Sequence, residues 1–565
     1  MTVGEREKQL KRKLFLLVPA AFLALVLGIL IYRLIPTKKH MDPAAFFGSG
    51  EGSCAIVADG VLSETRGLVR DGALYLDSAS VSALITPSVF YDAAEEKLIV
   101  TTAREKTVYA ADGTAGGEVI FENGAAYIRS DVLTEKADVL IRREEAPDRA
   151  VAVTEFTPVR MTFAKDAPVR LRAGIKSPII ADVPEGTAVR VTDRLPDGSD
   201  AETKVGGWTH VVTEDGFFGY VKDDCLTDPR TEEIAEKKQA AAYTRTRLEA
   251  PVNLIFHQTD SAASNAALRE SLQGVEGPNV IAPTWFYLED TEGGVRSLAD
   301  EDYVRTAHEA GLSVFAVLND FDGNIASAGE TAEALGTDTG RSRIVRAVTD
   351  ETVSCGADGL VIDIELVRKE AAPDFLELIR ELSVEMRNAG KTLAVCDYVP
   401  AFTGYLNRAE QARVADYVIV MCYDEHTAGS DEAGPVASLP FVEKGLRDTI
   451  AVVGEEGTIA AIPFFSRLWE TKQGEKPSSR AYGMRTAREK AEELGLQVSY
   501  AEAAAQNYAE GRSGDADYAI WLEDAVSVEE KMKVVEASGC AGVAAWKLGL
   551  ETSDIWGVMS KHLPS

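Results

Sequence analysis

The feature that most constrains the fold of this chain is a repeated alternation of short apolar runs and helical stretches that begins after Pro251. Apolar runs of strand length that alternate with helices are typical of parallel sheets whose faces are covered by helices. Eight such units in about 310 residues predict a (β/α)8 barrel, also called a TIM barrel. A doubly wound open sheet is the alternative, but no Gly-rich phosphate loop follows the first run. The eight runs span residues 252–258, 279–288, 312–320, 359–365, 391–399, 416–424, 458–465 and 540–548.

Two carboxylates stand at the end of the fourth run, "GLVIDIE". Side chains alternate along a strand, so Val361, Asp363 and Glu365 share one face, and the apolar residues between them face the helices. The carboxyl ends of barrel strands form the active-site face, which predicts that both acids point into the barrel mouth. Like charges held close together raise the pKa of one carboxyl, which suits a general acid. A pair of solvated carboxylates at a strand end is the alternative, and spacing alone does not separate the two.

The stretch "DGLVIDIE" resembles the DGxDxDxE signature of glycoside hydrolase family 18, the chitinase-like barrels. Asp358, Gly359, Asp363 and Glu365 match the signature, and Val361 replaces the usual Asp or Asn. Three further stretches are similar to the spore-cortex and cell-wall branch of the family, the SleL/YaaH-like N-acetylglucosaminidases. These stretches span residues 279–290, 420–446 and 542–556.

The resemblance implies substrate-assisted retaining catalysis, in which the 2-acetamido oxygen of the sugar attacks its own anomeric carbon. It implies that Glu365 protonates the leaving oxygen and later activates water. It also implies that Asp363 orients the acetamide and that Tyr423 donates its hydroxyl to the acetamide oxygen. Valine cannot form a hydrogen bond, so Asp363 needs a partner other than residue 361. No metal ion or other cofactor is implied.

Four further residues are implied as substrate contacts. Asp358 belongs to the signature, Asp424 follows Tyr423, and Trp546 would form the floor under the sugar ring. Trp285 could stack on a neighbouring sugar. Packing in the core is the alternative for both tryptophans.

The segments before the barrel predict two small domains. Residues 53–145 contain short alternating segments that predict an α+β domain, and they resemble the N-terminal domain of copper amine oxidases. That likeness implies no copper site, because the segment has no His. Residues 155–228 resemble bacterial SH3-like domains, which often bind cell-wall peptide. A charged, Ala-rich linker is expected over 229–249, and the barrel domain over 250–562.

The N-terminus predicts a membrane anchor. No charged residue occurs from Leu14 to Tyr32, and this length comes close to the roughly 30 Å hydrocarbon thickness of a bilayer. A cleaved signal peptide and a buried helix are the alternatives, but the apolar region of a signal peptide usually has about 7–15 residues. The basic cluster at 11–13 precedes the run, so the positive-inside rule keeps the N-terminus in the cytoplasm. Residues 1–40 therefore predict a tail and single-pass anchor in the cell membrane, with an extracytoplasmic body.

Charge and residue spacing exclude several classes of function. The net charge is −31, with +6 on residues 1–40 and −37 on the rest. Such an acidic body repels nucleic-acid phosphates. The six Cys and six His show no metal-binding spacing.

Together these features predict a membrane-anchored extracytoplasmic hydrolase that cleaves β-1,4 N-acetylglucosamine linkages of peptidoglycan. Chitin is a possible substrate. A non-catalytic, lectin-like scaffold of the cell wall is the alternative, and retention of Glu365 and Tyr423 favours the enzyme.

Overall fold

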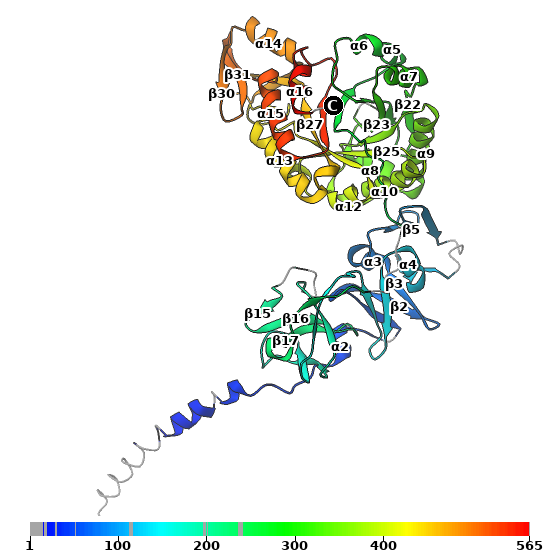
Figure 1. The fold of residues 1–565 in the computed structure, drawn as a ribbon, viewed down its shortest axis with the longest axis vertical. Coiled ribbons are helices and arrows are strands. Elements are labelled where there is room, and N and C mark those ends of the chain that lie inside the picture. Colours follow the sequence, from blue (N-terminus) through cyan, green and yellow to red (C-terminus); the bar gives the residue numbers. More distant parts are fainter. Residues whose placement is uncertain are drawn as a thin grey trace, which may run out of the picture. The chain divides into compact units, whose positions relative to one another are not determined.

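A computed structural model describes most of the chain (Figure 1). The described residues are 15, 18, 20–28, 31–50, 52–111, 117–195, 199, 202–234, 241–321 and 323–563. They form two compact units. The first comprises Met1–Val100 and Val108–Ala240, and the second comprises Thr101–Thr107 and Ala241–Ser565.

The predicted membrane span lies partly outside the described residues. Within 14–32, positions 14, 16, 17, 19, 29 and 30 are not described. Among the described residues, no helix is both long enough and apolar enough to cross a bilayer.

The first unit contains a seven-stranded sheet with the strand order β7-β8-β3-β2-β1-β10-β9. Helices α3 (Ser78–Leu84) and α4 (Ser130–Lys136) accompany it, and a three-stranded sheet is formed by β4 (Val89–Asp92), β5 (Lys97–Thr101) and β6 (Lys106–Ala110). The strands of the seven-stranded sheet are β1 (Ser53–Ala58), β2 (Val61–Arg70), β3 (Ala73–Asp77), β7 (Val119–Glu122), β8 (Ala125–Arg129), β9 (Leu140–Glu144) and β10 (Arg149–Val153).

An eight-stranded antiparallel sheet completes the first unit, together with helix α2 (Pro43–Phe47). Strand β1 contributes to both cores of this unit because its side chains alternate: Cys54 and Ile56 enter one core, and Ala55 and Val57 enter the other. The strands of this sheet are β11 (Val159–Thr162), β12 (Ala167–Arg170), β13 (Ile179–Val183), β14 (Ala188–Val191), β15 (Lys204–Val205), β16 (Trp208–Val212), β17 (Phe218–Lys222) and β18 (Arg230–Thr231).

The second unit contains the predicted barrel. Its eight strands pair in parallel in the order β19-β20-β23-β24-β25-β26-β27-β33, and pairing of β33 with β19 closes the ring. The prediction of an eight-stranded parallel barrel is therefore confirmed. The strands are β19 (Val252–His257), β20 (Val280–Pro283), β23 (Ser313–Asn319), β24 (Gly359–Asp363), β25 (Thr392–Tyr398), β26 (Tyr417–Met421), β27 (Thr458–Pro463) and β33 (Gly542–Trp546).

Helices cover the outside of the barrel (Figure 1). The longest pack through apolar stripes, as on α10, where Phe375, Leu378, Ile379 and Leu382 are buried. Short 3-10 turns occur at Asp223–Cys225, Lys369–Ala371 and Glu455–Gly457. The α-helices of this part are α5 (Ala262–Ala266), α6 (Leu268–Ser271), α7 (Glu301–Glu309), α8 (Ala328–Leu335), α9 (Asp338–Ser354), α10 (Ala372–Asn388), α11 (Pro400–Thr403), α12 (Arg408–Val414), α13 (Leu439–Val453), α15 (Ala525–Ser538) and α16 (Ile555–His562).

Two additions interrupt the barrel repeat. The predicted run 279–288 divides into β20 and a separate strand β21 (Phe286–Leu288), which forms a hairpin with β22 (Val295–Ser297). A five-stranded antiparallel sheet lies between β27 and α15, and we call it the insertion sheet. It consists of β28 (Phe465–Lys472), β29 (Ser478–Gly483), β30 (Gln497–Ala501), β31 (Gln506–Ser513) and β32 (Ala516–Leu522), with helix α14 (Met484–Glu493) between β29 and β30.

Candidate active site

The carboxyl ends of the parallel strands bring several polar residues to one end of the barrel. Asp363 is the last residue of β24, and Tyr398 is the last residue of β25. Asp320 follows β23, and Tyr423 lies two residues beyond β26. Because all these strands run in the same direction, their ends meet at the same face of the barrel.

Asp363 is a buried carboxyl surrounded by other acids. Its side chain is 2% exposed, and Oδ1 has no hydrogen-bond partner among the described residues. Burial raises the pKa of Asp363 well above its usual value, and the charges of Glu365 and Asp320 raise this pKa further. Asp363 therefore holds its proton at pH values where an exposed Asp would have lost it.

The Cys396 thiol affects the pKa of Asp363, which Val361 cannot do. Val361 is fully buried, and Cys396 lies on the neighbouring strand β25, one register step beyond the Ile362–Val395 pair. A side-chain hydrogen bond from Cys396 opposes the rise in the pKa of Asp363. Burial and the adjacent carboxylates raise the pKa of the Cys396 thiol, so the thiol stays protonated and keeps its S–H as a donor.

Glu365 is half-buried and is positioned by two neighbouring strands. The hydroxyl of Tyr398 donates to Oε2 of Glu365. The carboxylate of Asp320 accepts hydrogen bonds from the backbone N–H of Glu365 at 2.9 Å and of Leu366 at 3.0 Å. The side chain of Thr331 donates to the same carboxylate at 2.9 Å. Asp320 thus fixes the backbone at the point where β24 leaves the barrel, and Tyr398 fixes the carboxylate.

Tyr423 belongs to the same group. Its side chain is buried, and its pKa is raised well above the usual value, first by burial and then by the charges of Asp363, Cys396 and Glu365. Its ring meets Phe465 of the insertion sheet edge to face, with ring centroids 6.2 Å apart. The hydroxyl of Tyr423 therefore remains protonated beside both carboxyls and is available as a hydrogen-bond donor.

The sequence did not single out Asp320, Tyr398 or Cys396. Two of them stand at the ends of predicted runs, 312–320 and 391–399, where the barrel hypothesis already placed the active-site face. The polarity of those end positions was the signal that could have identified Asp320 and Tyr398. The partnership of Cys396 with Asp363 depends on strand register, which hydrophobic periodicity does not give.

A cavity of about 390 Å³ opens beside this group, and we call it the side cavity. Asp424 and Trp546, two of the predicted substrate contacts, line this cavity together with Arg467 of the insertion sheet. Asp424 has a positive φ of 59°, a backbone turn that lets residues 423 and 424 face the same region despite their alternation. Trp546 ends β33, and its ring lies 5.4 Å from that of Phe256.

Two of the predicted substrate contacts are not brought to this region. Asp358 precedes β24 and so lies at the opposite end of the strand from Asp363, where its Oδ2 accepts hydrogen bonds from His308 and from the N–H of Val314, each at 2.8 Å. Trp285 is fully buried, and its Nε1 donates to Oδ1 of Asn265 at 2.9 Å. Asp358 lies at the opposite end of β24 from Asp363, and Trp285 belongs to the core, so neither lies beside the acids at the barrel mouth.

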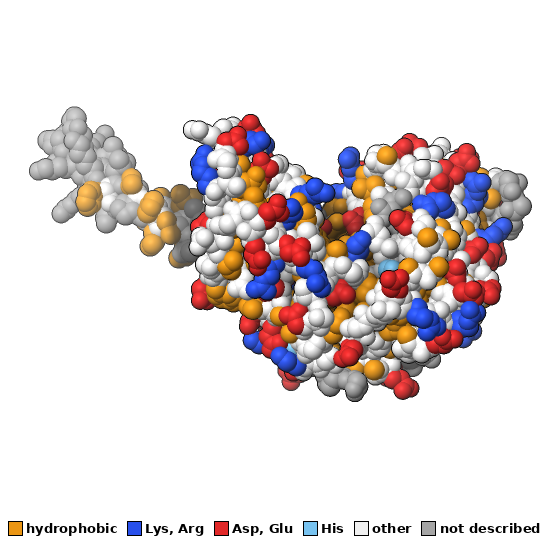
Figure 2. Space-filling model, turned by 90° about the horizontal axis from the view of Figure 1, so that it is seen from above, with side chains coloured by type: hydrophobic (Ala, Val, Ile, Leu, Met, Phe, Trp, Pro, Cys, Tyr) orange, Lys and Arg blue, Asp and Glu red, His pale blue; other side chains and the backbone are white. Residues whose placement is uncertain are grey.

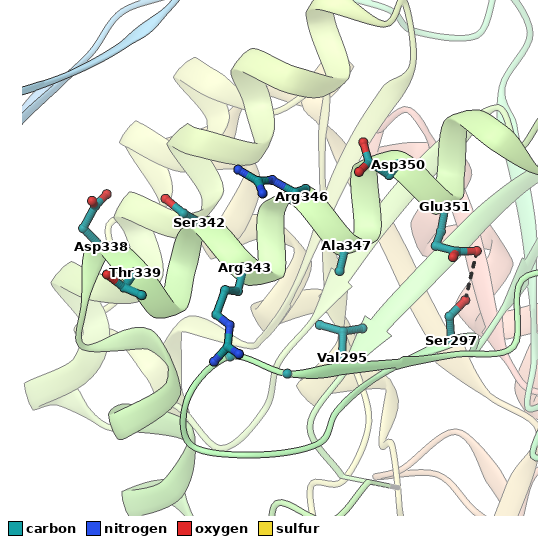
Figure 3. A pocket seen from close by; sticks show the side chains of 12 residues that line it. Val295, Ser297, Asp338, Thr339, Ser342, Arg343, Arg346, Ala347, Asp350 and Glu351 are labelled. Carbon is teal, nitrogen blue, oxygen red and sulfur yellow. Dashed lines mark hydrogen bonds between the residues drawn. The ribbon is translucent and has the colours of Figure 1, made fainter.

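A larger cavity of about 630 Å³ lies outside the barrel (Figure 3). It is formed by one side of α9 and by the β21–β22 hairpin, and Figure 3 shows Asp350, Arg346 and Arg343 projecting from the helix. Oε2 of Glu351 accepts a hydrogen bond from Ser297 across it. None of the predicted site residues lines this cavity. The volume of a cavity alone therefore does not identify the candidate active site.

The described residues suggest no metal centre. Among the parts of the chain that the structure covers, no group of three or more His, Cys, Asp or Glu has the arrangement of a metal site. The acids at the barrel mouth are instead arranged to share protons, because their mutual repulsion favours one protonated and one ionised carboxyl.

Comparison with known proteins gives a family match within the second unit. Residues 321–551 match the family model of Glycosyl hydrolases family 18. The matched segment begins directly after Asp320 and includes Asp363, Glu365, Tyr423 and Trp546. The second unit therefore matches this family over residues 321–551.

Proteins similar to this chain include two curated relatives and a solved chitinase structure. The sporulation-specific glycosylase YdhD of Bacillus subtilis (strain 168) is 26% identical over 238 residues, which cover 40% of this chain and 56% of that protein. The uncharacterized glycosylase YvbX of the same organism is 22% identical over 339 residues, 56% of this chain and 94% of that protein. A chitinase from Chromobacterium violaceum ATCC 12472 has a TM-score of 0.50 at 20% identity and covers 56% of this chain and 100% of that chain.

The family match and the relatives support a glycosidase. The likeness to the solved chitinase shows the fold alone. The resemblances of residues 53–145 and 155–228 to copper amine oxidase N-terminal and SH3-like domains stay predictions.

Proposed function

We propose that this protein hydrolyses β-1,4 linkages of N-acetylglucosamine in peptidoglycan by substrate-assisted retaining catalysis. The observation that carries the proposal is the grouping of Asp363, Glu365 and Tyr423 at the carboxyl ends of the barrel strands. Two carboxyls that share a proton and a tyrosine hydroxyl suit a reaction that develops positive charge on the sugar. In such a reaction one carboxyl first gives a proton to the leaving oxygen and then takes a proton from water.

In the first step the acetamido oxygen of the substrate attacks the anomeric carbon, and the bond from that carbon to the leaving oxygen breaks. Glu365 gives its proton to the leaving oxygen. With the proton that the two carboxyls share placed on Glu365, ionised Asp363 accepts the acetamide N–H and stabilises the positive charge of the oxazolinium intermediate, while Tyr423 donates to the acetamide oxygen. Because the substrate supplies its own nucleophile, a second carboxylate across the bond is not needed.

In the second step water attacks the anomeric carbon and restores the original configuration. Glu365 removes a proton from that water as the oxazolinium ring opens, and it thereby returns to its starting state. Tyr398 and Asp320 hold Glu365 in place during both transfers, since their hydrogen bonds fix its carboxylate and its backbone.

The proposal includes the location of the enzyme. The uncharged run 14–32 would anchor the chain in the cell membrane with its body outside, where peptidoglycan lies. Residues 155–228 would act as an SH3-like wall-binding module. YdhD is described as sporulation-specific, which makes spore cortex an alternative to vegetative wall as the target.

A lectin-like, non-catalytic role is the second candidate, and one observation favours it. Val361 is buried below Asp363 and leaves Oδ1 of Asp363 without a hydrogen-bond partner among the described residues. A site that only binds glycan does not need an Asp that is held in one orientation.

Glu365→Gln separates the two candidates. Loss of a general acid lowers the rate by roughly 10²–10⁴-fold, so release of reducing ends from purified peptidoglycan should fall by that factor while binding persists. Glu370→Gln, an exposed change five residues away, is the matched control and should keep full activity. If wild type and Glu365→Gln release equally few reducing ends, the binding role replaces the enzyme. Mass spectrometry of the products identifies the bond that is cut.

A further inference from the structure

The end of strand β25 carries Tyr398, whose hydroxyl donates to Glu365. The pairing of β25 with β26 continues to Tyr398. Its pairing with β24 ends at Ile362 and Val395, three residues before Tyr398. On the side of Glu365, strand pairing therefore does not fix the backbone of Tyr398, and its position there depends on contacts from outside the sheet.

Two side chains donate to the backbone oxygen of Tyr398. Nη2 of Arg408 lies 2.7 Å from this oxygen, and the hydroxyl of Thr403 lies 3.0 Å from it. Arg408 also donates to the hydroxyl oxygen of Thr403 and, at 2.9 Å, to the backbone oxygen of the same residue. Tyr398, Thr403 and Arg408 thus form a closed group of hydrogen bonds, which we call the Tyr398 clamp.

Helix α12 fixes Arg408, which is its first residue. The side chain of Asn407 caps this helix by accepting a hydrogen bond from the backbone N–H of Glu410 at 3.1 Å. Arg408 and Gln411 are three positions apart and so lie on the same side of the helix. The guanidinium of Arg408 forms an ion pair with Asp397 at 3.2 Å, and the amide of Gln411 donates to Asp397 at 3.3 Å. The clamp is therefore attached to a capped helix.

The ion pair of Arg408 and Asp397 is enclosed by protein. Figure 2 shows Lys, Arg, Asp and Glu side chains spread over the face that it views. The side chains of Arg408 and Asp397, in contrast, are only 4% and 0% exposed. Electrostatic contacts are stronger in the interior than in water, so this pair holds the guanidinium firmly beside the end of β25.

A second buried arginine, Arg380 of α10, has different partners. Its guanidinium donates to the carboxylates of Glu377 and Glu410, each at 2.9 Å. Arg408 pairs with one carboxylate and gives its hydrogen bonds to the segment from Tyr398 to Thr403. Arg380 therefore joins helices, whereas Arg408 holds the end of a strand that reaches Glu365.

We infer that Arg408 and Thr403 are positioning residues, which fix Tyr398 so that its hydroxyl holds the carboxylate of Glu365 in the orientation needed for proton transfer. They act through Tyr398 and have no role of their own toward the sugar. The inference rests on the proposed function and adds to it the groups that orient the general acid. Their position matters because a displacement of about 1 Å can lower a rate by about 10²-fold.

Thr403→Val is the first test, because valine has a similar shape and no hydroxyl. The full chain is assayed on soluble glycan strands from peptidoglycan, and kcat and KM are measured separately. We expect kcat to fall by about fivefold, the rate equivalent of one hydrogen bond, with KM unchanged because no substrate contact is lost. Thr403→Ser keeps the hydroxyl and should retain the wild-type kcat.

The same change is then made in Tyr398→Phe, where the hydroxyl that the clamp positions is missing. If Thr403 acts through that hydroxyl, Thr403→Val lowers kcat no further in this background. A purely structural loss instead lowers kcat by the same factor in both backgrounds, and that result overturns the inference.

Arg408→Lys tests the other half of the clamp. A single ammonium group cannot reproduce the planar donor set of a guanidinium, so kcat should fall by about tenfold in wild type and no further in Tyr398→Phe. Arg380→Lys is the matched control: it disturbs another buried ion pair and should lower the free energy of unfolding without changing kcat. Thr306→Val, which removes a hydroxyl that donates to the backbone oxygen of Asp302 at 2.8 Å, should also leave kcat unchanged.

The two ways of failing are distinguishable. An active wild type with unchanged kcat in both Thr403→Val and Arg408→Lys overturns the positioning role alone. If wild type releases no more reducing ends than Glu365→Gln, the proposed function fails, and a positioning role in that reaction is excluded as well.

Discussion

Two buried carboxyls of the second unit, those of Glu523 and Asp363, have opposite electrostatic surroundings. Glu523, after β32, accepts hydrogen bonds from Ser527 at 2.7 Å, from Gln506 at 2.7 Å and from Lys531 at 2.9 Å. Asp363 is equally buried, yet the groups that shift its pKa are two acids and a thiol, with no Lys or Arg among them. Burial raises the pKa of both, but a cation opposes the rise at Glu523 and further acids add to it at Asp363.

This difference separates a structural acid from a reactive one. A buried charge that only supports the fold is normally paired and hydrogen-bonded, as Glu523 is. A carboxyl that is left without a cation beside two other acids lowers the stability of the protein, and such a cost persists where function requires it. The comparison therefore predicts that changes at the two positions have opposite effects on stability and activity.

The largest effect is expected from Lys531→Met. The change leaves Glu523 as an uncompensated buried charge, and breaking one side of a buried pair costs about 3–5 kcal/mol. The free energy of unfolding, measured by denaturant titration, should fall by that amount. The loss should be smaller at low pH, because protonation of Glu523 removes the unpaired charge. The double variant Glu523→Gln/Lys531→Met should recover part of the stability, and a double variant as unstable as the single one would contradict this account.

Asp363→Asn should act on activity and not on stability. Removal of the carboxylate that stabilises the oxazolinium ion is expected to lower kcat on peptidoglycan by about a hundredfold, which is about 2.7 kcal/mol of barrier. The free energy of unfolding should stay the same or rise, because a repelled acid is replaced by a neutral amide.

The pH dependence of stability gives a second readout of Asp363. Since its folded pKa is raised above the unfolded value, the stability that its protonated form contributes is fully present below the unfolded pKa and is lost as pH rises through the folded pKa. The stability of Asp363→Asn minus that of wild type should therefore increase from pH 4 towards pH 8. A difference that shrinks over this range would show that Asp363 is stabilised as a carboxylate, as Glu523 is.

Tyr398→Phe, a change beside the reactive carboxyls, is expected to lower kcat less than Asp363→Asn does. It removes the hydrogen bond to Oε2 of Glu365 and leaves the ring in place. One lost hydrogen bond to a charged group corresponds to about tenfold in kcat. Tyr405→Phe, which removes a hydroxyl bonded to the backbone oxygen of Val367 at 2.7 Å, is the control and should lower kcat less. Equal losses in the two variants would mean that Tyr398 has no special role at Glu365.

The sequence predicts the barrel well because the two signals of the barrel, the apolar runs and the intervals between them, are local. Apolar runs and their intervals locate all eight strands, each within a few residues of the observed bounds. From the sequence, no structure is assigned to the long interval between the seventh and eighth runs, so the insertion sheet is not predicted. Its strands are partly exposed and lack a continuous apolar run, as in β30, where four of five residues are exposed.

The sequence predicts those site residues whose positions follow from one strand, but not the contacts between strands. Asp363 and Glu365 follow from alternation along β24, whereas Asp358 was misplaced because a motif continuous in sequence extends over a strand about 16 Å long. Trp285 was misplaced because its partner Asn265 lies on another element. Contacts between strands, such as that of Tyr398 with Glu365, depend on the order and register of the barrel, which the apolar pattern does not contain.

The smallest and most specific effect is expected at Val361. An Asn buried in an apolar strand without a partner costs about 1–3 kcal/mol, and Val543→Asn on β33 should show that cost because Val543 is fully buried. At Val361 the new amide could donate to Oδ1 of Asp363, which is buried without a partner among the described residues. Val361→Asn should therefore lower the free energy of unfolding by less than about 1 kcal/mol. It should also raise kcat a few-fold, since an oriented Asp363 holds the acetamide better. A stability loss equal to that of Val543→Asn would mean that the Cys396 thiol already satisfies Asp363, and that this chain has replaced the family's polar residue with a thiol on the next strand.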